Sequence, residues 1–111
     1  MYGFGRIDTS GRVTDRAVTG ALGWRQGDRL TLTADAGMVV ARRDPDGMIT
    51  VPVRSCVVIP AALRLRCGLR PGDRVLLAAV LSLDALAAWP MAAVDQAMRA
   101  QYPMRDELGG R

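Results

Sequence analysis

The side chains that could do chemistry in this sequence are almost all arginines. The 111 residues include 15 arginines, no lysine and no histidine, and the net charge is +4. A guanidinium group is planar and forks onto pairs of phosphate oxygens. An arginine-only basic set with a pI near 10 therefore suits a nucleic-acid partner. The alternative explanation for the missing lysines is a bias in genomic base composition.

The positive charge is unevenly distributed along the chain. Residues 1–75 contain twelve arginines and seven aspartates, which gives +5, whereas residues 76–111 contain three arginines and four acids, which gives −1. We therefore expect a surface that binds a polyanion to belong to the first two thirds of the chain. The competing interpretation is that these arginines are solvated charges that balance Asp8, Asp15 and Asp28.

The residue types needed for most catalytic or metal sites are missing. Cys56 and Cys67 are the only thiols, and two cysteines without histidine or a second cysteine pair do not complete a zinc site. No Ser–His or Cys–His pair is available for nucleophilic catalysis. Asp28 and Asp73 stand in turns, where a structural role is sufficient. We expect reduced, buried cysteines, no enzyme activity, no metal and no cofactor.

An internal repeat organises the chain. The string "GWRQGDRLTLT" at residues 23–33 returns 45 residues later as "GLRPGDRVLLA" at residues 68–78, and an internal repeat of this kind determines the architecture. We predict a first repeat at residues 5–43, a linker containing "DPDG" at 44–48, a second repeat at 49–89 and a C-terminal helix at 90–102.

Each repeat has the same order of signals: strand, turn, short helix, strand, turn, strand. The first helix has Thr14 or Asp15 as its cap and ends at Gly23, while the second has Pro60 at its first position and ends at Gly68. Both helices are too short to be stable alone, so packing must hold them. The predicted strands are 5–8, 29–33 and 38–42 in the first repeat, and 49–53, 74–79 and 85–89 in the second.

The two "GD" turns connect each helix to the following strand. Gly27 and Gly72 are expected to adopt a positive φ, and the aspartate after each glycine is expected to bond back to backbone amides. One unit of three strands and a two-turn helix buries too little surface to fold alone. We therefore expect a mainly β protein with short helices, in which both units pack face to face and close one small barrel.

The C-terminal helix carries an apolar stripe of Met91, Val94 and Met98. We expect this stripe to cover an open edge of the barrel or to form a homodimer. Pro90 and Pro103 bound the helix. The longest weakly charged stretch, residues 75–94, contains Asp84 and Pro90, and the N-terminus has no basic segment followed by an apolar one. We therefore expect a cytoplasmic protein without a membrane segment.

The strings "IDTSGRV" and "VVIPAALRLRCGLRPGDRV", together with the two "GD" turns, resemble the AbrB/MazE/SpoVT family of swapped-hairpin DNA-binding domains. The resemblance covers about residues 5–89. It implies a swapped-hairpin β-barrel, here in a tandem two-repeat form similar to the cell-division regulator MraZ or to two-repeat actinobacterial members. It also implies a cytoplasmic, nucleoid-associated regulator of transcription that binds double-stranded DNA.

The resemblance also implies which residues bind DNA. Arg6 matches a basic residue on the first strand, Arg12 matches the arginine of the "GR" turn, and Arg64 matches a helix arginine. There are three further candidates. Arg16 is on the first helix, Arg54 is close to the position of the missing "GR" turn in the second repeat, and Arg66 is on the second helix.

Each repeat lacks a different part of that pattern. Ser55 and Cys56 replace the "GR" turn in the second repeat, and the first helix lacks the usual "IP" start. A lopsided DNA-binding surface is one consequence. The alternative function is an antitoxin-like or other protein-interaction module that binds a toxin through residues 89–102, with weak or no DNA binding.

Overall fold

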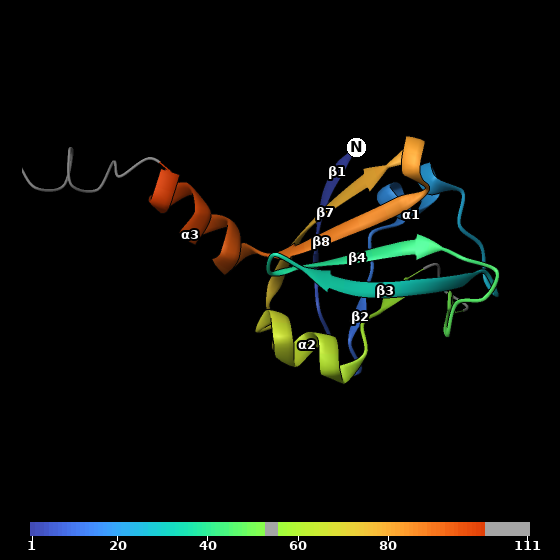
Figure 1. Ribbon diagram of the computed structural model, residues 1–111, viewed down its shortest axis with the longest axis horizontal. Helices are drawn as coiled ribbons and strands as arrows, with labels where there is room; N and C mark the ends of the chain where they lie inside the picture. Colours follow the sequence, from blue (N-terminus) through green and yellow to red (C-terminus); the bar gives the residue numbers. More distant parts are fainter. Residues whose placement is uncertain (53–55, 102–111) are drawn as a thin grey trace, which may run out of the picture.

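The computed structural model describes residues 1–52 and 56–101, and in this part the chain is mainly β with three short α-helices, as predicted (Figure 1). The helices are α1 (Arg16–Leu22), α2 (Ala61–Cys67) and α3 (Met91–Gln101), with a 3-10 turn at Leu81–Leu83. The strands are β1 (Tyr2–Arg6), β2 (Arg12–Val13), β3 (Arg29–Asp35), β4 (Met38–Arg43), β5 (Ile49–Thr50), β6 (Val57–Val58), β7 (Arg74–Val80) and β8 (Ala85–Pro90).

Six strands form one antiparallel sheet in the order β1-β7-β8-β4-β3-β5. This order is symmetric about its centre, because the hairpins β3–β4 and β7–β8 stand side by side through β4 and β8. The outer strands are exchanged between the two sequence copies. Strand β1 of the first copy pairs with β7 of the second, and β5 of the second copy pairs with β3 of the first.

The two "GD" turns occupy corresponding places in this exchange. Gly27 has a φ of 90° and donates its N–H to the carbonyl of Val51 at 2.9 Å, while Gly72 has a φ of 86° and donates to the carbonyl of Ile7 at 2.7 Å. The positive φ at both glycines was predicted and is confirmed. Each turn in one copy is therefore bonded to the first segment of the other copy.

The sheet does not close, and the prediction of a closed barrel is wrong. Strands β1 and β5 are the two edges of the sheet and do not pair with one another. Strand β5 has only two residues, and Pro52, two residues after it, has no N–H to donate to a ladder. In addition, β2 and β6 form a separate two-stranded sheet, and the only further pairing given for them is a bridge from Val13 to Ile7.

The first strand of each copy also differs from its predicted range. Strand β1 begins at Tyr2, three residues earlier than expected, because pairing with β7 extends to Tyr2 opposite Ala78. The predicted strand at 49–53 is confirmed only at Ile49–Thr50, and residues 53–55 lie outside the part that the structure describes.

Capping side chains and glycines define α1 and α2. Asp15, and not Thr14, caps α1, since its Oδ1 accepts hydrogen bonds from the N–H groups of Ala17 and Val18 at 3.0 and 3.1 Å. Gly23 and Gly68 end the two helices with left-handed φ values of 69° and 67°, as predicted. Pro60 lies one residue before α2 and not at its first position.

The core lies between one face of the six-stranded sheet and the elements packed on it. Helix α1 packs on β7 and α2 packs on β3, so each helix contacts a hairpin of the other copy. Val18 and Leu22 anchor α1 and are buried, as predicted, whereas Leu63 and Cys67 on α2 are only partly buried. The most fully buried large side chains are Ile7, Val18, Leu30, Val39, Ile59, Val75 and Leu77.

Helix α3 starts directly after β8 and projects from the end of the sheet (Figure 1). Pro90 is the last residue of β8 and not the first of the helix, so the observed helix begins one residue later than predicted. Residue 102, the predicted last residue, lies outside the described part. No described helix combines the length and apolar character that crossing a membrane requires.

A polar cluster connects the link after α1 to the turn between β7 and β8. Asp84 accepts hydrogen bonds from Arg43 Nε at 2.7 Å and from Trp24 Nε1 at 2.9 Å, and Arg43 Nη1 also lies 3.3 Å from Asp28 Oδ2. The bond from Arg43, and then the bond from Trp24, hold the pKa of Asp84 below its usual range. The cluster is therefore a structural use of one of the arginines.

We expect Asp84→Asn to lower stability at neutral pH but not in acid. A carboxylate with a depressed pKa contributes stability above its unfolded pKa of about 3.9, and that contribution is lost as the pH falls through its folded pKa. Asparagine suits the left-handed backbone at this position, where φ is 49°. Thermal unfolding from pH 7 to pH 2 should show a melting-temperature difference of about 2–4 °C that shrinks as the pH falls below about 4 and is lost once the pH is below the folded pKa of Asp84. A difference independent of pH would contradict this assignment, and Asp35→Asn, at an exposed hairpin position, is the control.

Candidate nucleic-acid interface

The turn that carries Arg12 is built by a local hydrogen-bond network. Asp8 Oδ1 accepts hydrogen bonds from the N–H groups of Ser10 at 2.9 Å and Arg12 at 2.8 Å, and Gly11 adopts a φ of 84°. An aspartate that bonds the amides two and four residues ahead fixes a tight turn. The side chain of Arg12 is exposed at the end of this turn.

The turn of the first copy lies directly on the segment that leads into α2 of the second copy. Ile59 donates its N–H to the carbonyl of Gly11 at 2.8 Å, and Arg64 Nε donates to the carbonyl of Ile59 at 3.0 Å. A Cβ atom on Gly11 would lie 2.5 Å from the Ile59 oxygen and 2.9 Å from Arg64 Nε. This close approach brings the guanidinium of Arg64 to the backbone of Gly11, the residue before Arg12.

Arg6 lies on the same exposed side as Arg12. Ile7 and Val13 form an antiparallel bridge, and both side chains are buried in the core. Successive side chains of an extended backbone point to opposite faces. Arg6 and Arg12, each adjacent to one of these buried residues, therefore both point to solvent. Of the six predicted DNA-binding residues, Arg6 and Arg12 are thus exposed on the same side of this bridge, and Arg64 reaches the turn at Gly11.

For two of the other three predicted residues, Arg16 and Arg66, no contact with these arginines is seen in the described part of the chain. Arg16 is the exposed first residue of α1, which packs on β7 and β1, and it takes part in no ion pair among the described residues. Arg66 is exposed on α2, but residues two positions apart on a helix do not share a face, so it points away from Arg64. Arg54 lies outside the described residues.

Sequence reasoning missed one arginine of this surface. Arg74 is the first residue of β7 and lies directly opposite Arg6 in the register of β1 and β7. The two side chains share a shallow hollow of about 340 Å³ with Phe4 and Gly5. The sequence signal was the arginine that follows "GD" in both copies, but its position opposite Arg6 depends on the exchange of β1 into the second hairpin.

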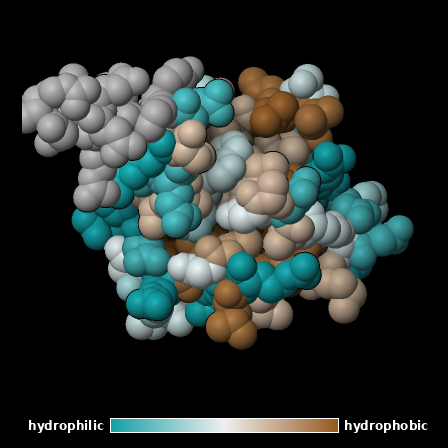
Figure 2. Space-filling view, turned by 60° about the vertical axis from the view of Figure 1, so that its left-hand side comes forward, coloured by the Kyte–Doolittle hydropathy of each residue, from teal (hydrophilic) through white to brown (hydrophobic). Residues whose placement is uncertain are grey.

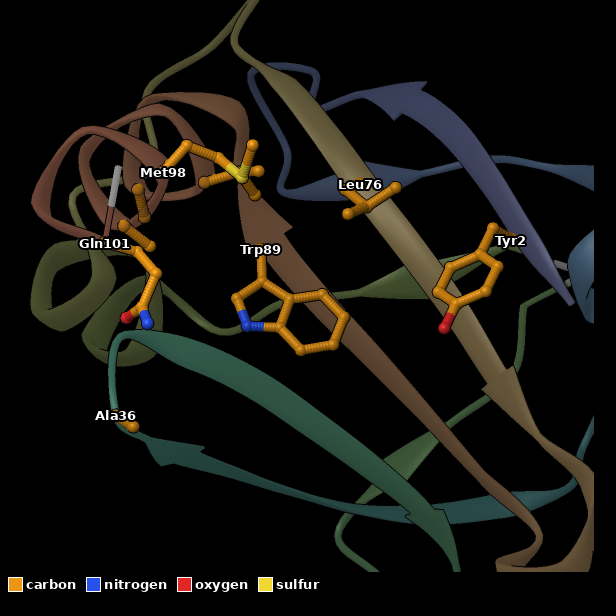
Figure 3. Close-up of a pocket in the computed structure, with 9 residues that line it drawn as sticks. Tyr2, Ala36, Leu76, Trp89, Met98 and Gln101 are labelled. Atoms are coloured by element: carbon orange, nitrogen blue, oxygen red, sulfur yellow. The ribbon is translucent and has the colours of Figure 1, made fainter. Parts of the chain in front are cut away.

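An apolar groove lies elsewhere, between α3 and the outer face of the sheet. Its volume is about 480 Å³. Figure 3 shows Tyr2, Leu76 and Trp89 along neighbouring strands, with Met98 and Gln101 facing them from α3. Val94 also lines the groove, so two of the three residues of the predicted apolar stripe face it, while Met91 is not in its lining.

Several large hydrophobic side chains are exposed near this groove. Tyr2, Phe4 and Met98 have 73%, 55% and 55% of their surface accessible. Figure 2 shows one face of the molecule, on which hydrophobic residues form separate patches between hydrophilic ones. The described part of the protein thus has a cationic surface around Arg12 and an apolar groove below α3.

Comparison of the chain with protein-family models, with curated proteins and with solved structures finds no significant match. The function must therefore be inferred from the residues and their arrangement.

Proposed function

We propose that this protein is a DNA-binding regulator of transcription of the AbrB/MazE/SpoVT swapped-hairpin type, with both repeats in one chain. The observation that carries the proposal is the exchange of β1 and β5 between the two hairpins. In a swapped-hairpin fold, the first strand of each unit pairs with the hairpin of the other unit, and β1 and β5 pair in this way. It also explains why the chain contains the "GD" turn and its neighbouring strands twice.

The exchange also determines where the arginines lie. The "GR" turn of one copy is bonded to Ile59, just before the helix of the other, and this supports a surface to which Arg12 and Arg64 contribute from two repeats. Guanidinium groups on such a surface bond phosphate oxygens and, in the major groove, the O6 and N7 atoms of guanine. Because the second copy has Ser55–Cys56 in place of "GR", we expect the two halves to contact DNA unequally.

The experiment that tests this proposal is duplex binding as a function of salt concentration. Five to eight phosphate contacts give a log–log slope of the binding constant against salt of roughly −4 to −7. Selection of bound sequences from random duplexes at moderate salt would then identify the operator. A shallow slope together with no enriched sequence would contradict the proposal.

A second candidate function is a protein-interaction module, and the apolar groove below α3 favours it. Val94 and Met98 are available there for a homodimer or a toxin. The two functions are distinguished by the gel mobility of a labelled promoter fragment with the intact chain and with a variant that lacks residues 90–111. The variant should still bind the fragment if the arginine surface contacts DNA. The deletion should abolish any interaction with a protein partner through α3. Light scattering on the intact chain measures whether it dimerises.

A further inference from the structure

Arg6 and Arg74 form a cross-strand pair of like charges. The two residues are directly opposite one another at the end of the β1–β7 ladder, and both are exposed. Arg6 Nη1 donates to the carbonyl of Gly72 at 3.1 Å, which holds its guanidinium over the start of β7. The other N–H groups of Arg6 remain available, since a guanidinium has five.

No carboxylate in the described part of the chain neutralises this pair. Neither arginine takes part in an ion pair among the residues that the structure describes. The two nearest aspartates along the chain are bonded to backbone amides: Asp73 Oδ2 accepts from the N–H of Arg70 at 2.9 Å, and Asp8 Oδ1 accepts from the turn. Like charges directly opposite one another destabilise an antiparallel pair. An oxyanion between the two guanidinium groups converts this repulsion into two charge-assisted interactions.

The other half of the molecule provides an internal comparison. Arg29 follows the first "GD" turn as Arg74 follows the second, but its partner across the ladder is Thr50 on β5. The neighbouring backbone is arranged in the same way, with a glycine of positive φ two residues before each arginine. Among the residues that the structure describes, the ladder position after the second "GD" turn therefore has two arginines opposite one another, and the position after the first has one.

We propose that Arg6 and Arg74 together bind one phosphate group in the hollow beside Phe4 and Gly5. This inference relies on the proposed function for the source of the phosphate, which is then the backbone of a DNA duplex. Arg6 belongs to the surface around Arg12, and the pair extends that surface onto β7. The corresponding position with Arg29 and Thr50 has one guanidinium group and is expected to bind phosphate more weakly, so the pair adds to the inequality of the two halves.

Inorganic phosphate tests the pair without DNA. Thermal unfolding is measured for the wild type, Arg74→Gln and the matched control Arg29→Gln, in chloride and in phosphate at equal ionic strength. We expect phosphate to raise the melting temperature of the wild type and of Arg29→Gln more than that of Arg74→Gln. At low ionic strength in chloride, Arg74→Gln should melt above the wild type because the repulsion is removed. Equal phosphate shifts for all three proteins would overturn the proposal.

Duplex binding identifies the source of the phosphate. For the same three proteins, Arg74→Gln should flatten the log–log salt slope by about 0.9, while Arg29→Gln leaves it closer to the wild-type value. If the wild type responds to phosphate through Arg74 but binds no duplex, the proposed function fails and the pair is a site for free phosphate. If the wild type binds duplex and the slope of Arg74→Gln is unchanged, the assignment of the pair to the DNA surface is overturned.

Discussion

Replacing Gly47 with alanine should lower the free energy of unfolding by about 2–4 kcal/mol. Gly47 is buried in the turn between β4 and β5, where its N–H donates to the carbonyl of Asp44 at 2.9 Å. An added Cβ would collide with the backbone of Leu30, at 2.5 Å from its carbonyl carbon and 2.7 Å from its nitrogen. Leu30 is fully buried in β3, so its backbone cannot move aside without disturbing the core.

Gly20→Ala is the matched control for this substitution. Gly20 lies within α1, and a Cβ added there meets no atom within 4 Å apart from its chain neighbours and the backbone of its own helix. Alanine in a helix interior should therefore raise stability by about 0.5–1 kcal/mol. Urea unfolding followed by circular dichroism measures both changes. Equal midpoints for Gly47→Ala and the wild type would show that this turn does not pack on β3 as described.

The double substitution of Arg6 and Arg12 by alanine should reduce the affinity for duplex DNA about 100-fold at low salt. Each guanidinium lost from a phosphate contact removes roughly 1.4 kcal/mol, which corresponds to a factor of about ten. The log–log salt slope should flatten by about 0.9 for each arginine. Both side chains are exposed, so we expect the melting temperature to change little compared with the affinity.

Arg99→Ala is the control for the loss of positive charge. Arg99 is on α3, where it lies 3.9 Å from Asp95, in a segment that projects from the sheet. If affinity depended only on net charge, Arg99→Ala would weaken binding as much as either single substitution of Arg6 or Arg12. Fluorescence anisotropy with a labelled duplex measures each protein. Unchanged affinity in the double variant would place the DNA-binding surface elsewhere on the molecule.

Features that depend on a few neighbouring residues were predicted well. The cap at the start of α1, the glycines that end both helices and the positive φ at Gly27 and Gly72 all follow from local stereochemistry. The β3–β4 and β7–β8 hairpins were also expected near their observed positions. In each case the residues that determine the conformation lie within one turn or one strand.

Features that depend on pairing between distant segments were predicted poorly. The closed barrel is absent because β5 stops after two residues and β2 and β6 pair apart from the main sheet. The position of Arg74 opposite Arg6 was missed, as was the use of Arg43 in the cluster with Asp84. The register of paired strands depends on contacts across the sheet. The same contacts decide which of the many arginines lies opposite Arg6 and which one bonds to Asp84.

The sequence by itself determined that the protein has two copies of one unit, that each copy turns at "GD", and that arginines carry its positive charge. The repeat and the turns depend only on residues that are close together in the sequence, so the sequence is sufficient to predict them. Only the tertiary structure decided which strand of one copy pairs with which hairpin of the other. That choice depends on burying apolar faces such as those of Ile7, Val75 and Leu77 against partners far away in the chain, and it placed Arg6 opposite Arg74.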